Sequence, residues 1–506
     1  MSNNPNEKLD IHLFSKKGIH IIYDVQLNKV HVVKQELYNY LQQTNGVVST
    51  DAVPEKYRKF VSRLSRYVEE ITPPQDRRIV GLTALINQKC NMRCVYCYGK
   101  DGSYGAPISD ECMSEEMLFN TIDLLMEISG DAPVVNFTFF GGEPLLSFDL
   151  MKSGITYARR RAKEYNKEIL LNFITNGILL SPEVIQYFID NDIYVAMSVD
   201  GDRDINDSAR KYGNKSHHDT VVKNLAPFKN KLDVSIRATI TRHNYKEINK
   251  SITHFSNHGW NRMIFEAVAK GGEDDILLTD ENLKELSKVY EEVFERLTND
   301  VGLFEKKIVG PFTMTFLRVA FKKQKDYHFC SAGRWSIAVD TKGNIYPCHR
   351  LIGNKDYIVG KVTDKLDTSV FDNFFGADIN SREGCKTCWA RYLCGGGCLR
   401  ESMINGDIKK TLPANCDSIK AMTEMGIYSF ARLGWLKILP KIPTFFSPTI
   451  AKLKILPLAL RGMEGAKSMP GHRWRYSDYS RIIKSSKDKR GVVSNNCSAA
   501  KLPPSQ

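Results

Sequence analysis

The sequence predicts an α/β protein, with a partial (β/α)6 TIM-like barrel between a small winged-helix-like module and a cysteine-rich domain. Short β-rich runs alternate with helical stretches through the middle of the chain. The first 75 residues show a hairpin pattern followed by two helical patterns, and most of the twelve cysteines fall in two distant segments. Strand–helix alternation is typical of parallel βαβ units, whose functional sites lie at the carboxyl ends of the strands.

The barrel is expected over residues 76–310. Six runs rich in β-branched and aromatic residues are the expected strands: Gly81–Ile86, Val134–Phe140, Glu168–Thr175, Ile193–Val199, Val234–Ile240 and Met263–Ala267. The stretches between them with helical periodicity are the expected helices: Ser114–Ser129, Asp149–Tyr165, Pro182–Asn191, His217–Phe228 and Tyr245–His258. Six strands rather than eight favour an open, partial barrel.

The N-terminal module is expected over residues 1–75. Ile11–Asp24 and Val30–Val33 alternate apolar and polar residues around a short turn, which predicts a hairpin. Helices are expected over Lys34–Gln43 and Glu55–Glu70, and the prolines that follow end the second helix. A module of this shape can present an open sheet edge to a peptide.

The positive charge of the chain is concentrated at its C-terminal end. The net charge is +13; residues 431–506 carry fifteen Lys and Arg against three Asp and Glu, so 15 − 3 = +12 lies there and 13 − 12 = +1 elsewhere. Because the body is nearly neutral, we do not expect a nucleic-acid-binding protein. The sequence lacks a run of eighteen apolar residues and its first residues are polar, so a cytoplasmic protein is expected.

The basic C-terminal segment, residues 426–506, is predicted to be partly disordered. Over residues 428–460 it mixes aromatic and aliphatic residues with lysines and prolines. Two interpretations stay open: a peripheral contact with an anionic membrane surface, and packing as a layer on the cysteine-rich domain.

The first cysteine group is Cys90-x3-Cys94-x2-Cys97, directly after the first expected strand. Three thiolates on one loop can hold three irons of a four-iron cluster and leave the fourth iron open to a small chelating molecule. A structural zinc site normally has four ligands, and no fourth Cys or His is adjacent. A non-catalytic iron–sulfur or zinc scaffold stays open as an alternative of a different class.

The next expected strand ends in Gly141-Gly142-Glu143-Pro144. Glycines let a backbone approach a ligand closely, and Glu143 offers a carboxylate that can accept hydrogen bonds from an ammonium group. Further polar residues end or follow later strands: Thr175, Asn176, Ser198, Asp200 and Arg210.

Seven cysteines form a second set in the segment 311–425. They are Cys330, Cys348, Cys385, Cys388, Cys394, Cys398 and Cys416. In a reducing compartment, tight cysteine clusters indicate metal ligands rather than disulfides. A zinc ribbon over Cys385, Cys388, Cys394 and Cys398 is the alternative. Cys112 and Cys497 belong to neither set.

The CxxxCxxC loop followed by GGEP resembles the signature of the radical S-adenosylmethionine (SAM) superfamily. The resemblance implies that Cys90, Cys94 and Cys97 hold a 4Fe-4S cluster whose open iron binds SAM, and that one electron cleaves SAM to a 5′-deoxyadenosyl radical. That electron would come from a donor such as flavodoxin or ferredoxin. The implied SAM-binding residues are Tyr96, Gly141, Gly142, Glu143, Pro144, Ser198 and Arg210. No residue is assigned a catalytic role.

The second cysteine set resembles the SPASM domain of peptide-modifying radical SAM enzymes, which binds two auxiliary 4Fe-4S clusters. The implied outer-cluster ligands are Cys385, Cys388, Cys394 and Cys416. The implied inner-cluster ligands are Cys330, Cys348 and Cys398. The chain is therefore expected to bind SAM and three 4Fe-4S clusters.

The segment around Cys348 and the N-terminal module resemble maturases of ribosomally made peptides, of the sactipeptide and ranthipeptide (SCIFF maturase-like) group. Anaerobic sulfatase-maturating enzymes carry a catalytic Asp where this chain has His349. The resemblance implies a precursor peptide bound through its leader by the N-terminal module, and a thioether between a cysteine sulfur and a carbon. Carbon–carbon or carbon–oxygen cross-links are the alternative within this class.

Overall fold

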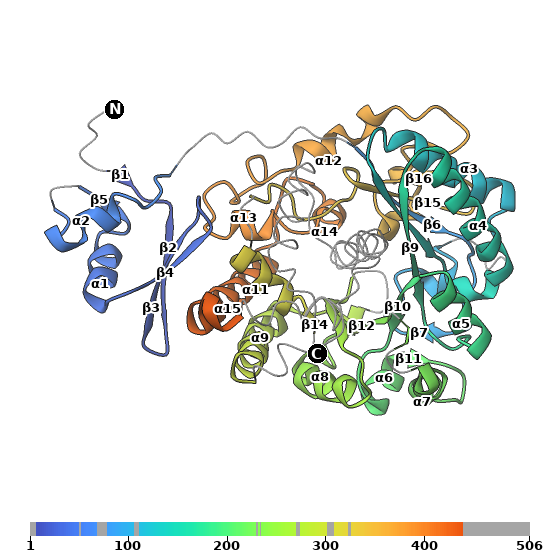
Figure 1. Ribbon diagram of the computed structural model, residues 1–506, viewed down its shortest axis with the longest axis horizontal. Coiled ribbons are helices and arrows are strands. Elements are labelled where there is room, and N and C mark those ends of the chain that lie inside the picture. Colours follow the sequence, from blue (N-terminus) through green and yellow to red (C-terminus); the bar gives the residue numbers. More distant parts are fainter. Residues whose placement is uncertain are drawn as a thin grey trace, which may run out of the picture.

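The structure is a computed structural model that describes residues 7–49, 52–67, 78–105, 111–228, 231–232, 234–269, 274–300, 308–321 and 325–438. Figure 1 shows a curved sheet with helices on its outer side, and the small N-terminal module at one end of the molecule.

A ten-stranded sheet forms the centre of the molecule, in the order β14-β13-β12-β10-β9-β8-β6-β15-β16-β17. All six expected strands are present and pair in parallel with their neighbours. Their bounds are β6 (Gly81–Leu85), β8 (Val134–Phe140), β9 (Glu168–Thr175), β10 (Tyr194–Ser198), β12 (Val234–Ile240) and β13 (Arg262–Ala267). The prediction of an α/β fold with a mostly parallel sheet is confirmed.

The sheet extends beyond the expected barrel at both edges. β14 (Ile308–Gly310) adds to β13. β15 (Ser336–Val339), from the cysteine-rich segment, pairs in parallel with β6. β16 (Asn344–Tyr346) and β17 (Gly360–Lys361) then follow in antiparallel fashion. The cysteine-rich segment therefore continues the sheet of the barrel.

The five expected helices of the barrel are present within a few residues of their predicted bounds: α3 (Glu115–Ile128), α4 (Phe148–Glu164), α5 (Pro182–Asp190), α7 (His217–Leu225) and α8 (Ile248–Asn257). Three of them begin at a serine, Ser114, Ser181 or Ser216, whose side chain accepts a hydrogen bond from the third helical backbone N–H. Helices that were not predicted include α6 (Arg203–Ala209), α9 (Asp280–Asn299) and α11 (Phe312–Phe321).

The two faces of the sheet differ in packing. Phe137, Phe139 and Phe173 are fully buried in the main hydrophobic core. The alternate residues Thr138 and Asn172, which are paired across β8 and β9, are only half-buried. Strands of a parallel sheet are usually buried on both faces. Because Figure 1 shows the helices on the outer side of the sheet, the half-buried polar face is the inner face of the barrel.

The N-terminal module has one more turn than predicted. The segment 11–24 is two strands, β2 (Ile11–Lys16) and β3 (Ile19–Asp24), joined at Lys17 and Gly18 with φ of 48° and 77°. β4 (Lys29–Val33) completes the sheet, α1 (Gln35–Gln43) follows, and the short strands β1 (Glu7–Lys8) and β5 (Val47–Val48) pair with each other.

The predicted helix over Glu55–Glu70 is too long. α2 (Glu55–Val61) ends nine residues earlier, because the chain turns so that Leu64 enters the core of the module. The Arg66 side chain accommodates this end by donating to the backbone oxygens of Val61 (3.3 Å) and Leu64 (2.6 Å).

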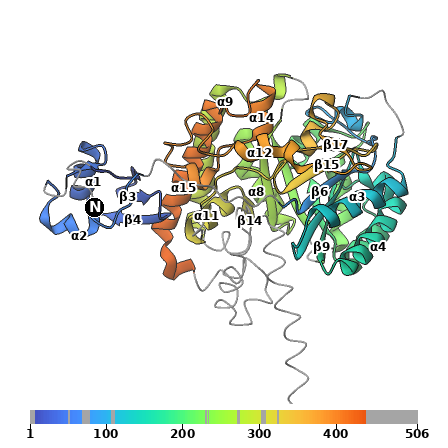
Figure 2. The same ribbon diagram turned by 90° about the horizontal axis from the view of Figure 1, so that it is seen from above.

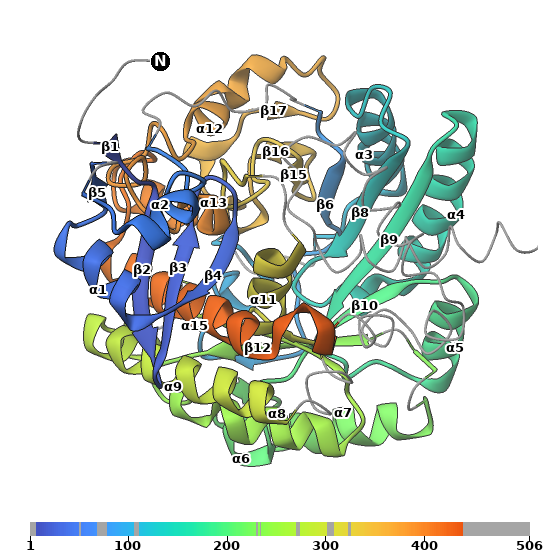
Figure 3. The ribbon, with the colours of Figure 1, turned by 60° about the vertical axis from the view of Figure 1, so that its left-hand side comes forward.

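The N-terminal module shares the main core of the protein. Phe14, Ile21 and Tyr23 pack in the same hydrophobic cluster as the barrel strands. Figures 2 and 3 show α15 (Pro413–Ile438) running between the sheet of the module and the rest of the molecule. This helix crosses the expected boundary at residue 426, and Tyr428 is fully buried.

Among the helices of the described residues, none is long and apolar enough to cross a membrane. The two interpretations of residues 428–460 concern a segment that lies mostly outside the described residues, which end at Ile438. Up to that point the segment is helical and contributes Tyr428, Phe430 and Leu433 to the main core.

Candidate functional site

The first cysteine group lies on the loop after β6, at the carboxyl end of the sheet. Burial raises the pKa of Cys94 to about 12, and the neighbouring Cys97 and Cys90 sulfurs contribute to the same rise. Burial likewise raises the pKa of Cys90 to about 11. Buried thiols that neighbour one another become thiolates when a metal binds. The donor set therefore fits the expected iron–sulfur cluster.

The glycines of the GGEP loop pack against this cysteine loop. A side chain at Gly142 would meet the backbone oxygen of Lys89 at 2.1 Å, and the backbone N–H of Glu143 donates to the same oxygen (2.8 Å). The hydroxyl of Tyr104 donates to the backbone oxygen of Gly141 (3.3 Å). Pro144 begins a short 3-10 helix. The glycine at 142 is thus required by the close approach of two loops.

Glu143 points into the protein. Its Oε1 accepts hydrogen bonds from the backbone N–H of Leu145 (3.0 Å) and the Thr175 hydroxyl (2.8 Å), and its Oε2 accepts one from the backbone N–H of Asn176 (2.7 Å). Burial raises the pKa of this carboxyl to about 7. Glu143 therefore joins the ends of β8 and β9. The expected contact of Glu143 with an ammonium group stays a prediction.

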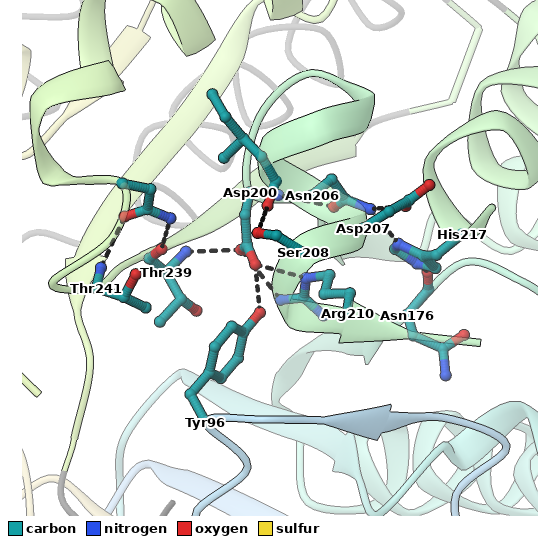
Figure 4. A network of polar contacts seen from close by, with 12 residues as sticks. Tyr96, Asn176, Asp200, Asn206, Asp207, Ser208, Arg210, His217, Thr239 and Thr241 are labelled. Atoms are coloured by element: carbon teal, nitrogen blue, oxygen red, sulfur yellow. Dashed lines mark hydrogen bonds and ion pairs between the residues drawn. The ribbon is translucent and has the colours of Figure 1, made fainter. Parts of the chain in front are cut away.

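Tyr96 and Arg210 meet at a third residue, Asp200, which follows β10 (Figure 4). The Tyr96 hydroxyl donates to Asp200 Oδ2 at 2.5 Å, and Arg210 donates to both carboxylate oxygens at 3.1 and 3.3 Å. The backbone N–H of Thr239 completes the set at 2.8 Å. The Arg210 guanidinium also lies 5.4 Å from the centre of the Tyr96 ring. Asp200 thereby holds the residue before Cys97 against the barrel.

The network continues to the other side of the cysteine loop. Asn206 Oδ1 accepts from the backbone N–H of Asp200 (3.1 Å), and its Nδ2 lies 2.8 Å from His217 Nδ1. With Nδ1 accepting, His217 Nε2–H donates to the backbone oxygen of Asn176 (2.7 Å). The Asn176 Nδ2 lies 3.9 Å from Cys90 Sγ. Burial, followed by the charge of Arg210, lowers the pKa of His217 to about 4, so the ring is neutral.

The sequence identified two strand-end residues of this network, Asn176 and Asp200, but gave Asp200, Asn206 and His217 no role. Their contacts depend on segments that meet only in the folded barrel. Ser198, the remaining expected SAM contact, is half-buried at the end of β10.

The later cysteines gather in two groups. Burial raises the pKa of Cys348 to about 12, with Cys330 and Cys398 contributing. Burial raises the pKa of Cys385 to about 12, and the contributing cysteines are Cys394, Cys388 and Cys416. The cysteines that act on one another's pKa here are the same two sets that the SPASM resemblance implies, and their binding of two clusters stays a prediction. Cys112 is exposed, 3.5 Å from the Ser147 hydroxyl, and Cys497 lies outside the described residues.

The sequence of this chain is similar to those of known proteins. The family described as "Radical SAM superfamily" matches residues 84–255. A cysteine-type anaerobic sulfatase-maturating enzyme of Clostridium perfringens is 23% identical over 68% of this chain and 94% of its own. The radical SAM cyclopropyl synthase TigE of Paramaledivibacter caminithermalis is 23% identical over 68% of this chain and 72% of its own.

The fold is also found among solved structures. The structure of native anSMEcpe with bound AdoMet and Cp18Cys peptide superposes with a TM-score of 0.60. It is 20% identical and covers 70% of this chain and 99% of that chain.

Proposed function

Because this chain belongs to the radical SAM superfamily, we propose that it is a peptide maturase that joins a cysteine sulfur to a carbon of a ribosomally made precursor. The observation that carries this proposal is that ten cysteines fall into three groups whose members lie close enough to raise one another's pKa. One group has three members on a single loop, as an open iron requires. A scaffold protein does not need that open position.

We assign the residues the following roles in the proposed reaction. Cys90, Cys94 and Cys97 would hold the radical cluster, and SAM on its open iron supplies a 5′-deoxyadenosyl radical when the cluster is reduced. The Asp200 network fixes the loop that carries these cysteines, and Glu143 fixes the loop that faces it. The remaining seven cysteines would hold two auxiliary clusters, and the reducing electron would come from a donor such as flavodoxin or ferredoxin.

A peptide substrate is supported by the relatives and by the N-terminal module. A solved structure of similar fold contains a peptide beside AdoMet. In this chain β4 is an edge strand of the module, and Val32 on it is 58% exposed. An exposed sheet edge can take up a peptide as an additional strand. We therefore propose that β4 binds the leader of the precursor.

A thioether is proposed because of the residue after Cys348. This residue is His349, whose ring lies 6.3 Å from that of Tyr98 and 5.5 Å from that of Phe140. The nearby carboxylate, Glu266, contacts two arginines, and the pKa of its carboxyl is lowered to about 2, mainly by Arg237. Such a carboxylate is a poor proton acceptor, which disfavours the oxidation carried out by sulfatase-maturating enzymes.

The first experiment is anaerobic reduction of the reconstituted protein with SAM. A radical SAM enzyme releases 5′-deoxyadenosine, whereas a scaffold releases none. The second is co-expression with a short, cysteine-containing peptide encoded beside its gene. A thioether lowers the peptide mass by two hydrogen atoms and removes one thiol that iodoacetamide can label. A cross-link that leaves every thiol free would favour a carbon–carbon or carbon–oxygen bond.

A further inference from the structure

Three charged side chains meet on the inner face of the barrel: Arg237, Glu266 and Arg350. Arg237 lies on β12, in register with Ser198 of β10, and Glu266 lies near the carboxyl end of β13. Arg350 lies in the 3-10 helix His349–Leu351 after β16, two residues beyond Cys348. None of the three was singled out by the sequence, because they come together only across the barrel.

The three side chains carry a net positive charge. Arg237 Nη2 and Arg350 Nη2 both donate to Glu266 Oε2, the second at 3.2 Å. Each guanidinium has five N–H donors, so Glu266 occupies a minority of them. Because the Glu266 carboxylate stays ionised, two cations and one anion leave a charge of +1.

The three side chains lie beside two cysteine-bearing segments of the chain. The side chains are 27% (Arg237), 44% (Glu266) and 23% (Arg350) exposed to solvent. Partial burial raises the pKa of Glu266, but the neighbouring Arg237 lowers it by more. The Arg350 guanidinium is 6.0 Å from the centre of the Tyr98 ring, and Tyr98 is the residue that follows Cys97 in the sequence. These three charged side chains therefore lie between the loop of Cys90, Cys94 and Cys97 and the residue Cys348. They remain partly exposed to solvent.

We propose that this cluster binds a carboxylate of the peptide and so selects an acidic residue beside the one that is modified. The inference rests on the proposed function, whose substrate it narrows. Arg350 lies two residues beyond Cys348, an expected cluster ligand, and it belongs to the segment that carries this cysteine. Arg237 is therefore the main recognition group. A guanidinium can grip a carboxylate with two parallel hydrogen bonds, and these are strong where water is partly excluded.

A purely structural role for the cluster makes a different prediction. An ion triad that only ties β12, β13 and the Cys348 loop together would be indifferent to added carboxylates. Arg237→Lys keeps the positive charge but loses the planar pair of donors. This variant therefore separates recognition by geometry from recognition by charge alone.

The test measures binding of two small probes to the reconstituted holoenzyme by saturation-transfer NMR. The probes are N-acetyl-aspartate N-methylamide and its asparagine counterpart. We expect the wild type to bind the aspartate probe about ten-fold or more tightly than the asparagine probe, as for a charge-assisted hydrogen bond. Arg237→Gln should abolish this preference, and Arg237→Lys should retain part of it.

The matched control is Arg203→Gln, which removes an exposed arginine paired with Asp219 on the outside of the barrel. This variant should bind both probes as the wild type does. Equal binding of the two probes by the wild type, or an unchanged preference in Arg237→Gln, would overturn the proposal. Release of 5′-deoxyadenosine is measured on the same wild-type preparation. A wild type that binds the aspartate probe but never cleaves SAM would refute the proposed function and leave the anion site intact.

Discussion

Two buried Asp–Arg pairs hold cysteine-bearing loops in this molecule, and they do so over very different distances in the sequence. Asp200 and Arg210 are ten residues apart and bind Tyr96, which stands between Cys94 and Cys97. Asp10 and Arg391 are 381 residues apart, and Arg391 Nη1 also donates to the backbone oxygen of Cys388 (2.9 Å). The first pair is internal to the barrel, and the second joins the N-terminal module to the outer cysteine group.

The second pair shows that the N-terminal module is fixed to the cysteine-rich segment by a buried ion pair. Next to it, the His12 ring stacks on Trp389 with centroids 3.7 Å apart, and His12 Nε2 lies 2.6 Å from Glu424 of α15. Trp389 directly follows Cys388. Deleting residues 1–75 would remove Phe14 and Ile21 from the main core and leave Arg391 without its carboxylate. Point variants therefore test leader binding more cleanly than truncation.

The largest effect is expected from Asp200→Asn. The change leaves Arg210, which is 6% exposed, without its counter-ion, and losing one partner of a buried pair costs about 3–5 kcal/mol. Since the Tyr96 contact is weakened too, 5′-deoxyadenosine formation should fall by about a hundred-fold or more. Asp219→Asn is the control, because Asp219 is half exposed. Equal activity of the two variants would mean that the network does not support the radical site.

Asp10→Asn is expected to lose iron from the outer cysteine group only. Arg391 is 1% exposed, so its uncompensated charge should disturb the loop of Cys388. Iron content should fall by about four per chain, the content of one cluster, while the signal of the radical cluster persists. Lys56→Ala removes an exposed ion pair of the same module, that of Lys56 with Glu36, and should change stability by less than about 1 kcal/mol. A full iron complement in Asp10→Asn would show that the Asp10–Arg391 pair, unlike the Asp200–Arg210 pair, does not support the cysteine loop beside it.

A smaller effect is expected from protonation of His217. Its folded pKa of about 4 lies below the ordinary 6.5, so the unfolded chain binds more protons between these values. His217 should therefore lower the free energy of unfolding by about 3 kcal/mol as the pH falls from 6.5 to 4. Asp200, Asp207 and Arg210 are the charged groups that act on it.

The measurement compares wild type with His217→Gln, which cannot titrate, by chemical unfolding at several pH values. The comparison cancels the contribution of Glu143, whose raised pKa has the opposite sign. The difference between the two proteins should shrink as the pH falls. A constant difference from pH 6.5 to 4 would contradict the neutral, buried ring.

Much of the fold could be predicted because its signals are local. The strands of the barrel have compact β-rich runs, and spacing separates the cysteines into two sets, of which the second was divided only by its resemblance to the SPASM domain. β15 could not be predicted as part of the barrel, since its pairing with β6 joins residues far apart in the chain. The contacts of Glu266 with Arg237 and Arg350, and of Asp10 with Arg391, are tertiary and leave no pattern in the sequence.

The central claim is that three separate cysteine groups hold three clusters, and iron counting with Mössbauer spectroscopy tests it most directly. The reconstituted wild type should hold about twelve irons. Replacing Cys90, Cys94 and Cys97 together with Ala should leave about eight irons and abolish SAM cleavage. Replacing Cys330, Cys348 and Cys398 together should also leave about eight, with the spectrum of the radical cluster retained. A wild type that is stable with about eight irons, or a triple variant with an unchanged iron count, would contradict the assignment.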